Sequence, residues 1–134
     1  KGGLGFYRYE NGREKGCDPE IYAVLAGAVP EVRATLGQRE IRGRLVLAMV
    51  NEAARVLEEG IVRRASDVDL GMIMGTGFPP FRGGLLRFAD TIHSRTILSR
   101  LEELEERHGA RFAPADLIRR LARENRGFYE SFPG

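Results

Sequence analysis

The sequence predicts an all-α protein, a compact bundle of five or six helices. Apolar residues recur at helical spacing over residues 38–59. Glycine and proline stand between the apolar segments, where they end helices. No segment alternates apolar and polar residues convincingly, apart from a short extended "GFYRY" at residues 5–9. With 134 residues, the chain has the size of one ordinary domain.

The first element is a helix that follows a tail. Residues 1–17 are rich in glycine and charge and predict a linker or tail, so the domain is expected over residues 18–134. Asp18-Pro19-Glu20 is typical of a helix start, because an acidic cap, a proline in the first turn and a second acid suit the positive helix end. We expect this helix to run to about Gly27, before a break at Pro30.

The strongest helix is predicted over residues 38–59. Its apolar residues form one broad face: Ile41, Leu45, Met49 and Val56, with Val46, Val50, Ala53 and Leu57 beside them. Gly60 is placed to end the helix in the left-handed conformation.

Shorter helices follow. Ser66, with Asp69 three residues later, resembles a capping box for a helix that carries Val68, Leu70, Met72 and Ile73 and stops near Gly75. The segment "GGLLRFAD" at 83–90 starts the next helix.

Two further helices complete the bundle. Ser94 can cap a helix that runs to about Arg107 and ends at Gly109, with Ile97, Leu101 and Leu104 facing inward. Pro114 opens the last helix, which bears Leu117, Ile118 and Leu121.

Charge and cysteine content exclude several classes of protein. The formal net charge is only +2, since 21 basic residues face 19 acidic ones, and arginines alternate with acids along the helices. That pattern argues against nucleic-acid binding. No apolar run reaches the ~20 residues of a membrane span. Cys17 is the only cysteine, which favours a reducing, cytoplasmic setting, and the missing initial Met suggests a piece of a longer chain.

The stretch "GMIMGTGFPPFRGG" at 71–84 raises the question of a nucleotide loop. It fails as a dinucleotide fingerprint, because Pro80 takes the place of the third glycine and a helix, not a strand, precedes it. We predict a helix–loop–helix corner that packs on a partner domain, made of Gly75, Gly77, Phe78, Pro79, Pro80, Phe81, Arg82, Gly83 and Gly84. The alternative is an anion at the following helix N-terminus, near Arg82.

No catalytic constellation emerges from the remaining polar residues. His93 and His108 are far from other metal-ligand types and are expected at helix ends, and Cys17 lacks a histidine partner. Asn51 lies near the edge of the apolar face, where an interhelical hydrogen bond is favoured over a handle for a ligand. Arginines 119, 120, 123 and 126 could hold an acidic partner or a phosphate, but Asp116 and Glu124 dilute them, and Glu103–Arg107 suits a solvated helix face.

A short internal sequence repeat suggests that the domain is duplicated. "GLGFYRYENG" at 3–12 is similar to "NRGFYESFPG" at 125–134, which suggests that the first copy ends a preceding, related domain. Residues 38–129, above all "ASDVDLGMIMGTGFPPFRGG", resemble the C-terminal helical domain of 3-hydroxyacyl-CoA dehydrogenases in its multifunctional fatty-acid β-oxidation version.

The resemblance implies a larger protein. In that family a Rossmann domain binds NAD and supplies a His–Glu pair, an N-terminal domain hydrates enoyl-CoA, and the helical domain completes the acyl-CoA cleft. An Asn-Arg pair of the substrate-contacting copy corresponds here to Gly43-Arg44, so the asparagine is lost. The resemblance therefore implies the second, non-catalytic copy, without a cofactor or catalytic residue of its own. It would pack on the preceding helical and Rossmann domains, with a thiolase subunit as a further candidate partner. Alternatives are a CoA-binding module using Arg82 and the arginines of 119–126, or a self-dimer.

Overall fold

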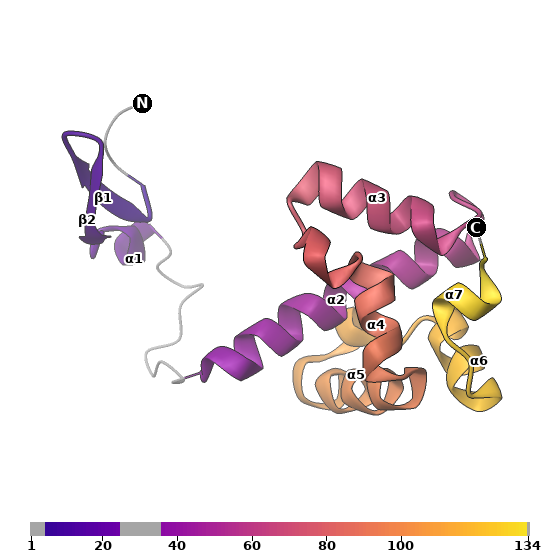
Figure 1. The fold of residues 1–134 in the computed structure, drawn as a ribbon. Helices are drawn as coiled ribbons and strands as arrows, with labels where there is room; N and C mark the ends of the chain where they lie inside the picture. Colours follow the sequence, from indigo (N-terminus) through magenta and orange to yellow (C-terminus); the bar gives the residue numbers. More distant parts are fainter. Residues whose placement is uncertain (1–4, 25–35, 134) are drawn as a thin grey trace. The chain divides into compact units, whose positions relative to one another are not determined.

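The computed structural model describes residues 5–24 and 36–133, and it divides into two compact units, residues 1–36 and 37–134 (Figure 1). Each unit is described by itself. The boundary between a tail of residues 1–17 and a domain of residues 18–134 remains a prediction.

The first unit contains a β-hairpin. Strand β1 (Tyr7–Glu10) pairs antiparallel with β2 (Arg13–Cys17), and β1 coincides with the predicted extended segment. The second strand was not predicted. Its signal is the dipeptide Asn11-Gly12, whose φ angles of 51° and 75° give the two-residue turn that suits the twist of a hairpin.

Asp18 joins the hairpin to the short helix α1 (Ile21–Val24). The residue is buried, and its carboxylate accepts hydrogen bonds from the backbone N–H of Glu20, at 3.0 Å, and from Nε of Arg8, at 3.1 Å. Asp18 thus accepts a backbone N–H, as a cap would, but α1 begins three residues after it, at Ile21. The expected end near Gly27 and the break at Pro30 lie outside the described residues.

The second unit is helical, as predicted, and its described residues form no strand. Its elements are α2 (Gln38–Glu58), α3 (Ala65–Thr76), the 3-10 turn η1 (Pro80–Arg82), α4 (Leu85–Ile92), α5 (Ser94–His108), the 3-10 turn η2 (Ala110–Phe112), α6 (Asp116–Glu124) and α7 (Phe128–Ser131). Helix α4 lies centrally, with α2, α3, α5 and α7 packed around it (Figure 1).

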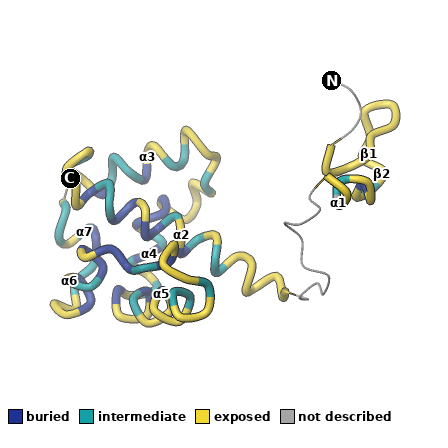
Figure 2. Tube along the Cα trace, turned by 180° about the vertical axis from the view of Figure 1, so that it is seen from behind, coloured by how far each residue is buried: buried dark blue, intermediate teal, exposed yellow. Residues whose placement is uncertain are grey.

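The core lies between the C-terminal half of α2 and helices α4, α5 and α6 (Figure 2). Val50, Leu86, Leu101 and Leu121 are completely buried, and Phe128 of α7 closes one side. Burying each such side chain contributes about 1.5–3 kcal/mol to folding. The predicted inward residues Ile97, Leu117 and Ile118 belong to this core, together with Ala53 and Leu57.

The N-terminal half of α2 departs from the prediction. Ile41 and Leu45 were expected on the buried face, but they are 42% and 61% exposed. The described helices pack only against the later turns of α2, so the first turns stay uncovered (Figure 2). Leu70 of α3 is likewise 62% exposed.

The glycines predicted to end helices do so, but the serines predicted to cap helices do not. Gly60 adopts φ 69°, and the N–H of Ile61 donates to Val56 as in a Schellman motif. Gly109 ends α5, as predicted. Ser66 and Ser94, however, lie inside their helices, with Arg64 and His93 at the cap positions and no side-chain cap bond at either.

Candidate functional site

The glycine-rich loop is a tight corner between α3 and α4. Gly77 ends α3 with φ 72°, and the N–H of Phe78 donates to Met72 across the end of the helix, two residues beyond the predicted stop. Gly83 and Gly84 follow η1 with φ of 78° and 112°. These are conformations that only glycine adopts at low cost.

The N-terminus of α4 is occupied by Asp69. Its carboxylate accepts hydrogen bonds from the backbone N–H of Leu86, at 2.6 Å, and of Arg87, at 3.0 Å. The capping box predicted for Asp69 was wrong, because this residue caps the next helix and not its own. The alternative of an external anion at this helix end is also wrong, because a carboxylate of the protein satisfies those donors.

Gly84 makes this arrangement possible. An ideal Cβ on Gly84 would overlap the Asp69 carboxylate. The same arrangement recurs at α7, where the carboxylate of Asp90 accepts hydrogen bonds from the N–H groups of Phe128, at 2.7 Å, and Tyr129, at 3.0 Å. There, a Cβ on Gly127 would lie 2.8 Å from Oδ1 of Asp90. The glycines of "FRGG" and "RGFY" thus leave room for carboxylates that come from other helices.

Tyr129 connects the two capped corners. Its hydroxyl donates to Oδ2 of Asp69 at 2.8 Å, and the guanidinium carbon of Arg87 lies 3.5 Å from its ring centroid. Burial, followed by the hydrogen bond to Asp69, raises the pKa of Tyr129 to about 12. This network stabilises the protonated phenol and holds α3, α4 and α7 together.

Asn51 makes the predicted structural bond. It is 2% exposed, its Nδ2 donates to the carbonyl of Ala113 at 2.9 Å, and its Oδ1 accepts from the N–H of Ala115 at 2.8 Å. Both partners belong to the chain just before α6. Asn51 therefore ties α2 to the start of α6, and its amide is not free to contact a ligand.

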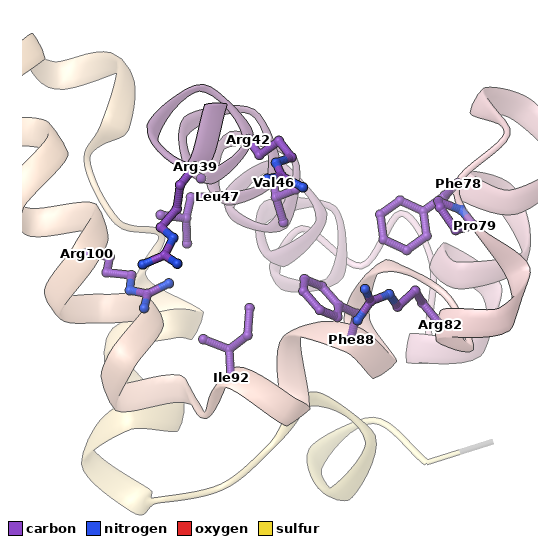
Figure 3. A pocket seen from close by; sticks show the side chains of 11 residues that line it. Arg39, Arg42, Val46, Leu47, Phe78, Pro79, Arg82, Phe88, Ile92 and Arg100 are labelled. Atoms are coloured by element: carbon purple, nitrogen blue, oxygen red, sulfur yellow. The ribbon is translucent and has the colours of Figure 1, made fainter. Parts of the chain in front are cut away.

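A pocket of about 420 Å³ lies between the uncovered start of α2, the glycine-rich corner, α4 and α5 (Figure 3). Gly43 and Arg82 both belong to its wall. The remaining lining residues are arginines or apolar: Arg39, Arg42, Val46, Leu47, Phe78, Pro79, Phe88, Ile92 and Arg100.

The lining limits what this pocket can do chemically. Among the described residues that line it, none carries a carboxylate, imidazole, thiol or hydroxyl group. Proton transfer and nucleophilic attack need such groups. Four guanidiniums over an apolar wall can instead bind and orient an anion.

Sequence reasoning found Arg82 and Gly43 but missed the other three arginines. Arg39 and Arg42 are three residues apart, which places them on one side of the helix, and this signal was available. Arg100 comes from α5 and could be added only from the fold.

Two of the four arginines in the predicted cluster near α6, Arg119 and Arg126, have glutamate partners. Arg119 contacts Glu102 at 3.0 Å, and Arg126 contacts Glu130 at 3.0 Å. Arg107 pairs with Glu103 at 2.7 Å, as predicted. Arg44, next to Gly43, pairs with Glu40.

The remaining candidate residues, His93, His108 and Cys17, are not part of the pocket lining. His93 and His108 stand at helix ends, as predicted, and Cys17 is an exposed free thiol. Within residues 5–24 and 36–133, no group of His, Cys, Asp and Glu has the arrangement of a metal site. In the same part of the chain, no helix is long and apolar enough to cross a bilayer.

Comparison with known proteins completes the description. Residues 41–131 match the family model described as 3-hydroxyacyl-CoA dehydrogenase, C-terminal domain. The chain is 43% identical over 131 residues to the fatty acid oxidation complex subunit alpha of Shewanella amazonensis, and 41% identical over 129 residues to that of Vibrio cholerae. Each alignment covers 96% of this chain but 18% of the relative, so the chain spans about a fifth of the length of these relatives.

Proposed function

Because the chain belongs to the 3-hydroxyacyl-CoA dehydrogenase C-terminal domain family, we propose that it is the second, non-catalytic helical copy in a multifunctional β-oxidation enzyme. The whole protein hydrates 2-enoyl-CoA and oxidises 3-hydroxyacyl-CoA with NAD. The role of this domain is structural: it packs on the preceding helical and Rossmann domains.

The observation that carries the proposal is the composition of the pocket around Gly43. Glycine offers no amide to a substrate hydroxyl or carbonyl, and the other lining residues supply no acid or base. A residual oxidation site would need both a proton acceptor and polar groups that orient the substrate. The described residues contribute binding surface there, and the chemistry falls to other parts of the protein.

Exposed apolar side chains support a packing role. Ile41 and Leu45 lie one turn apart on α2, and Leu70 and Met74 lie one turn apart on α3, so each pair forms a small apolar stripe. Phe81, at the tip of the glycine-rich corner, is 84% exposed. Apolar groups gathered in this way are typical of surfaces that another domain covers.

The catalytic part of the proposal is tested by assaying the 134-residue chain and the whole protein side by side. NADH consumption with acetoacetyl-CoA should be seen only with the whole protein. NADH consumption by the pure 134-residue chain that depends on added acetoacetyl-CoA would contradict a structural role.

The packing part is tested by supplying the domain separately. The helical unit is removed from the whole protein by ending it just before the position that is residue 37 in this chain. This shortened protein should lose dehydrogenase activity, and the 134-residue chain added separately should restore it. Leu45→Asp and Met74→Asp should each weaken this rescue at least about tenfold, since they put a charge on a buried apolar contact. Thr96→Asp, on an exposed position of α5, is the matched control and should rescue fully. Equal rescue by all variants would exclude the two stripes as the interface.

A further inference from the structure

The hairpin unit leaves its aromatic side chains exposed. Phe6 and Tyr7 are 66% and 41% exposed, and Tyr9 is 47% exposed. Figure 2 shows both strands almost entirely in the colour of exposed residues. Among the residues of this unit whose exposure the structure describes, the single buried one is the charged Asp18. Because a two-stranded hairpin without an apolar core is marginally stable at best in water, these aromatic side chains need a partner that covers them.

The helical unit shows how the same phrase is held when its partner is present. Gly127-Phe128-Tyr129 repeats the residues of Gly5-Phe6-Tyr7. Phe128 is 1% exposed and belongs to the core, on the side where α7 packs against α4. The phrase comes shortly after α6 and ends the helical unit. In a domain of this fold, a Gly-Phe-Tyr phrase is therefore the segment that closes the core.

Gly5 differs from its counterpart in its surroundings. A Cβ on Gly127 would lie 2.8 Å from the Asp90 carboxylate, whereas no described atom lies within 4 Å of a Cβ on Gly5. A close neighbour is what requires glycine at position 127, and the described residues supply no such neighbour at position 5. The backbone differs as well, because Tyr7 belongs to β1 and Tyr129 to α7. The feature that both copies share is thus the apolar side chain after the glycine, and not the carboxylate cap.

We propose that Phe6 inserts into the apolar core of a preceding helical domain of the same fold, so that the hairpin is anchored on that domain. This rests on the proposed function, which places such a domain before this chain, and it names the side chain that makes the contact. The relatives leave room for that domain, since this chain spans 18% of their length. Phe6 would then have the role there that Phe128 has in the helical unit.

Hydrogen–deuterium exchange followed by mass spectrometry compares the hairpin in the whole protein with the hairpin in the 134-residue chain. The backbone amides of residues 6–10 should exchange at least about tenfold more slowly in the whole protein, because docking of Phe6 suppresses local opening. Equal rates in the two proteins would overturn the proposal. Equally slow exchange would mean that the partner lies within the 134 residues, and equally fast exchange would mean that Phe6 is not docked.

Variants of the whole protein identify the partner. Phe6→Ala should speed exchange of residues 6–10 at least about tenfold and should also speed exchange in helices that precede Lys1, because a cavity opens in their core. Phe6→Leu keeps an apolar side chain and should retain most of the protection. Val24→Ala removes apolar bulk from an exposed position of α1 and should change exchange less than about twofold. If Phe6→Ala speeds exchange in residues 37–134 instead, the helical unit is the partner and the proposal is refuted.

The docking of Phe6 and the structural role of the helical unit can fail separately. The rescue of dehydrogenase activity, with Leu45→Asp and Met74→Asp, tests the structural role without changing Phe6. Fast exchange of residues 6–10 in a fully active whole protein would refute the docking and leave the structural role in place. Slow exchange there, together with equal rescue by all variants, would support the docking and exclude the two apolar stripes as the interface.

Discussion

Replacing Asp69 by alanine should be among the most destabilising single changes in the helical unit. The side chain is 3% exposed and accepts three hydrogen bonds, from the N–H groups of Leu86 and Arg87 and from the hydroxyl of Tyr129. Losing a helix cap costs about 1 kcal/mol. Leaving a buried donor without an acceptor costs about 1–3 kcal/mol more. Since the three bonds belong to one network, we expect a total of about 3–5 kcal/mol.

That loss is large against the ~5–15 kcal/mol that stabilises an ordinary domain. Urea unfolding followed by circular dichroism measures it, and with a slope of about 1–3 kcal/mol per molar urea the midpoint should fall by at least ~1 M. Asp69→Asn keeps one acceptor oxygen and turns an amino group toward the helix donors. Its unfolding midpoint should therefore lie between those of the wild type and Asp69→Ala.

Asp67→Asn is the matched control on the same helix. Within the described part of the chain, Asp67 pairs with the exposed Arg64 alone, and its replacement should leave the unfolding midpoint unchanged within error. If Asp69→Ala costs less than about 1 kcal/mol, the carboxylate is not the cap on which α4 depends. Glycine at position 84 would then not be required by that cap.

Three further predictions concern neighbouring positions. Gly84→Ala should lower the free energy of unfolding in urea by at least about 2 kcal/mol, because the φ of 112° and the contact with Asp69 both exclude a Cβ. Gly71→Ala, inside α3 with open space around it, is the control and should raise the free energy of unfolding by about 0.5–1 kcal/mol. Asn51→Leu should cost about 1–3 kcal/mol in the same assay, since the buried N–H of Ala115 loses its acceptor while the carbonyl of Ala113 keeps its bond from Arg55. Because the pKa of Tyr129 is raised to about 12 from an ordinary 10.0, its stabilising effect is complete below pH 10 and disappears between pH 10 and 12. Ultraviolet titration should show one late-ionising tyrosine that Tyr129→Phe removes and Asp69→Asn shifts to lower pH; an unchanged titration in both variants would contradict the network.

Local signals sufficed for part of the fold. Gly60 and Gly109 end their helices where the sequence predicts, because a positive φ at a helix end depends on one residue and its immediate neighbours. The hairpin was missed although its signal, Asn11-Gly12, is equally local. The helical class could be predicted from the order of such segments, whereas the family was indicated by the resemblance of "ASDVDLGMIMGTGFPPFRGG" to known members.

Long-range partners could not be predicted in the same way. Asp69 three residues after Ser66 has the spacing of a capping box, yet its partners are 17, 18 and 60 residues away in the sequence. Ile41 and Leu45 have the spacing of a buried face, yet the described helices do not reach them. Periodicity shows which side chains prefer to be covered, and only the packing shows what covers them.

The two aspartate caps explain why the most specific phrases of the sequence say little about chemistry. Gly84 and Gly127 belong to "GFPPFRGG" and "RGFY", and each is required because a carboxylate from a different helix occupies the space of its missing side chain. These requirements arise from packing within one helical unit and are independent of any reaction. Gly43, in contrast, has nothing within contact distance of its absent Cβ, so packing does not demand glycine there. The residue at position 43 can therefore vary without disturbing either corner, whereas Gly84 and Gly127 cannot be replaced in this way.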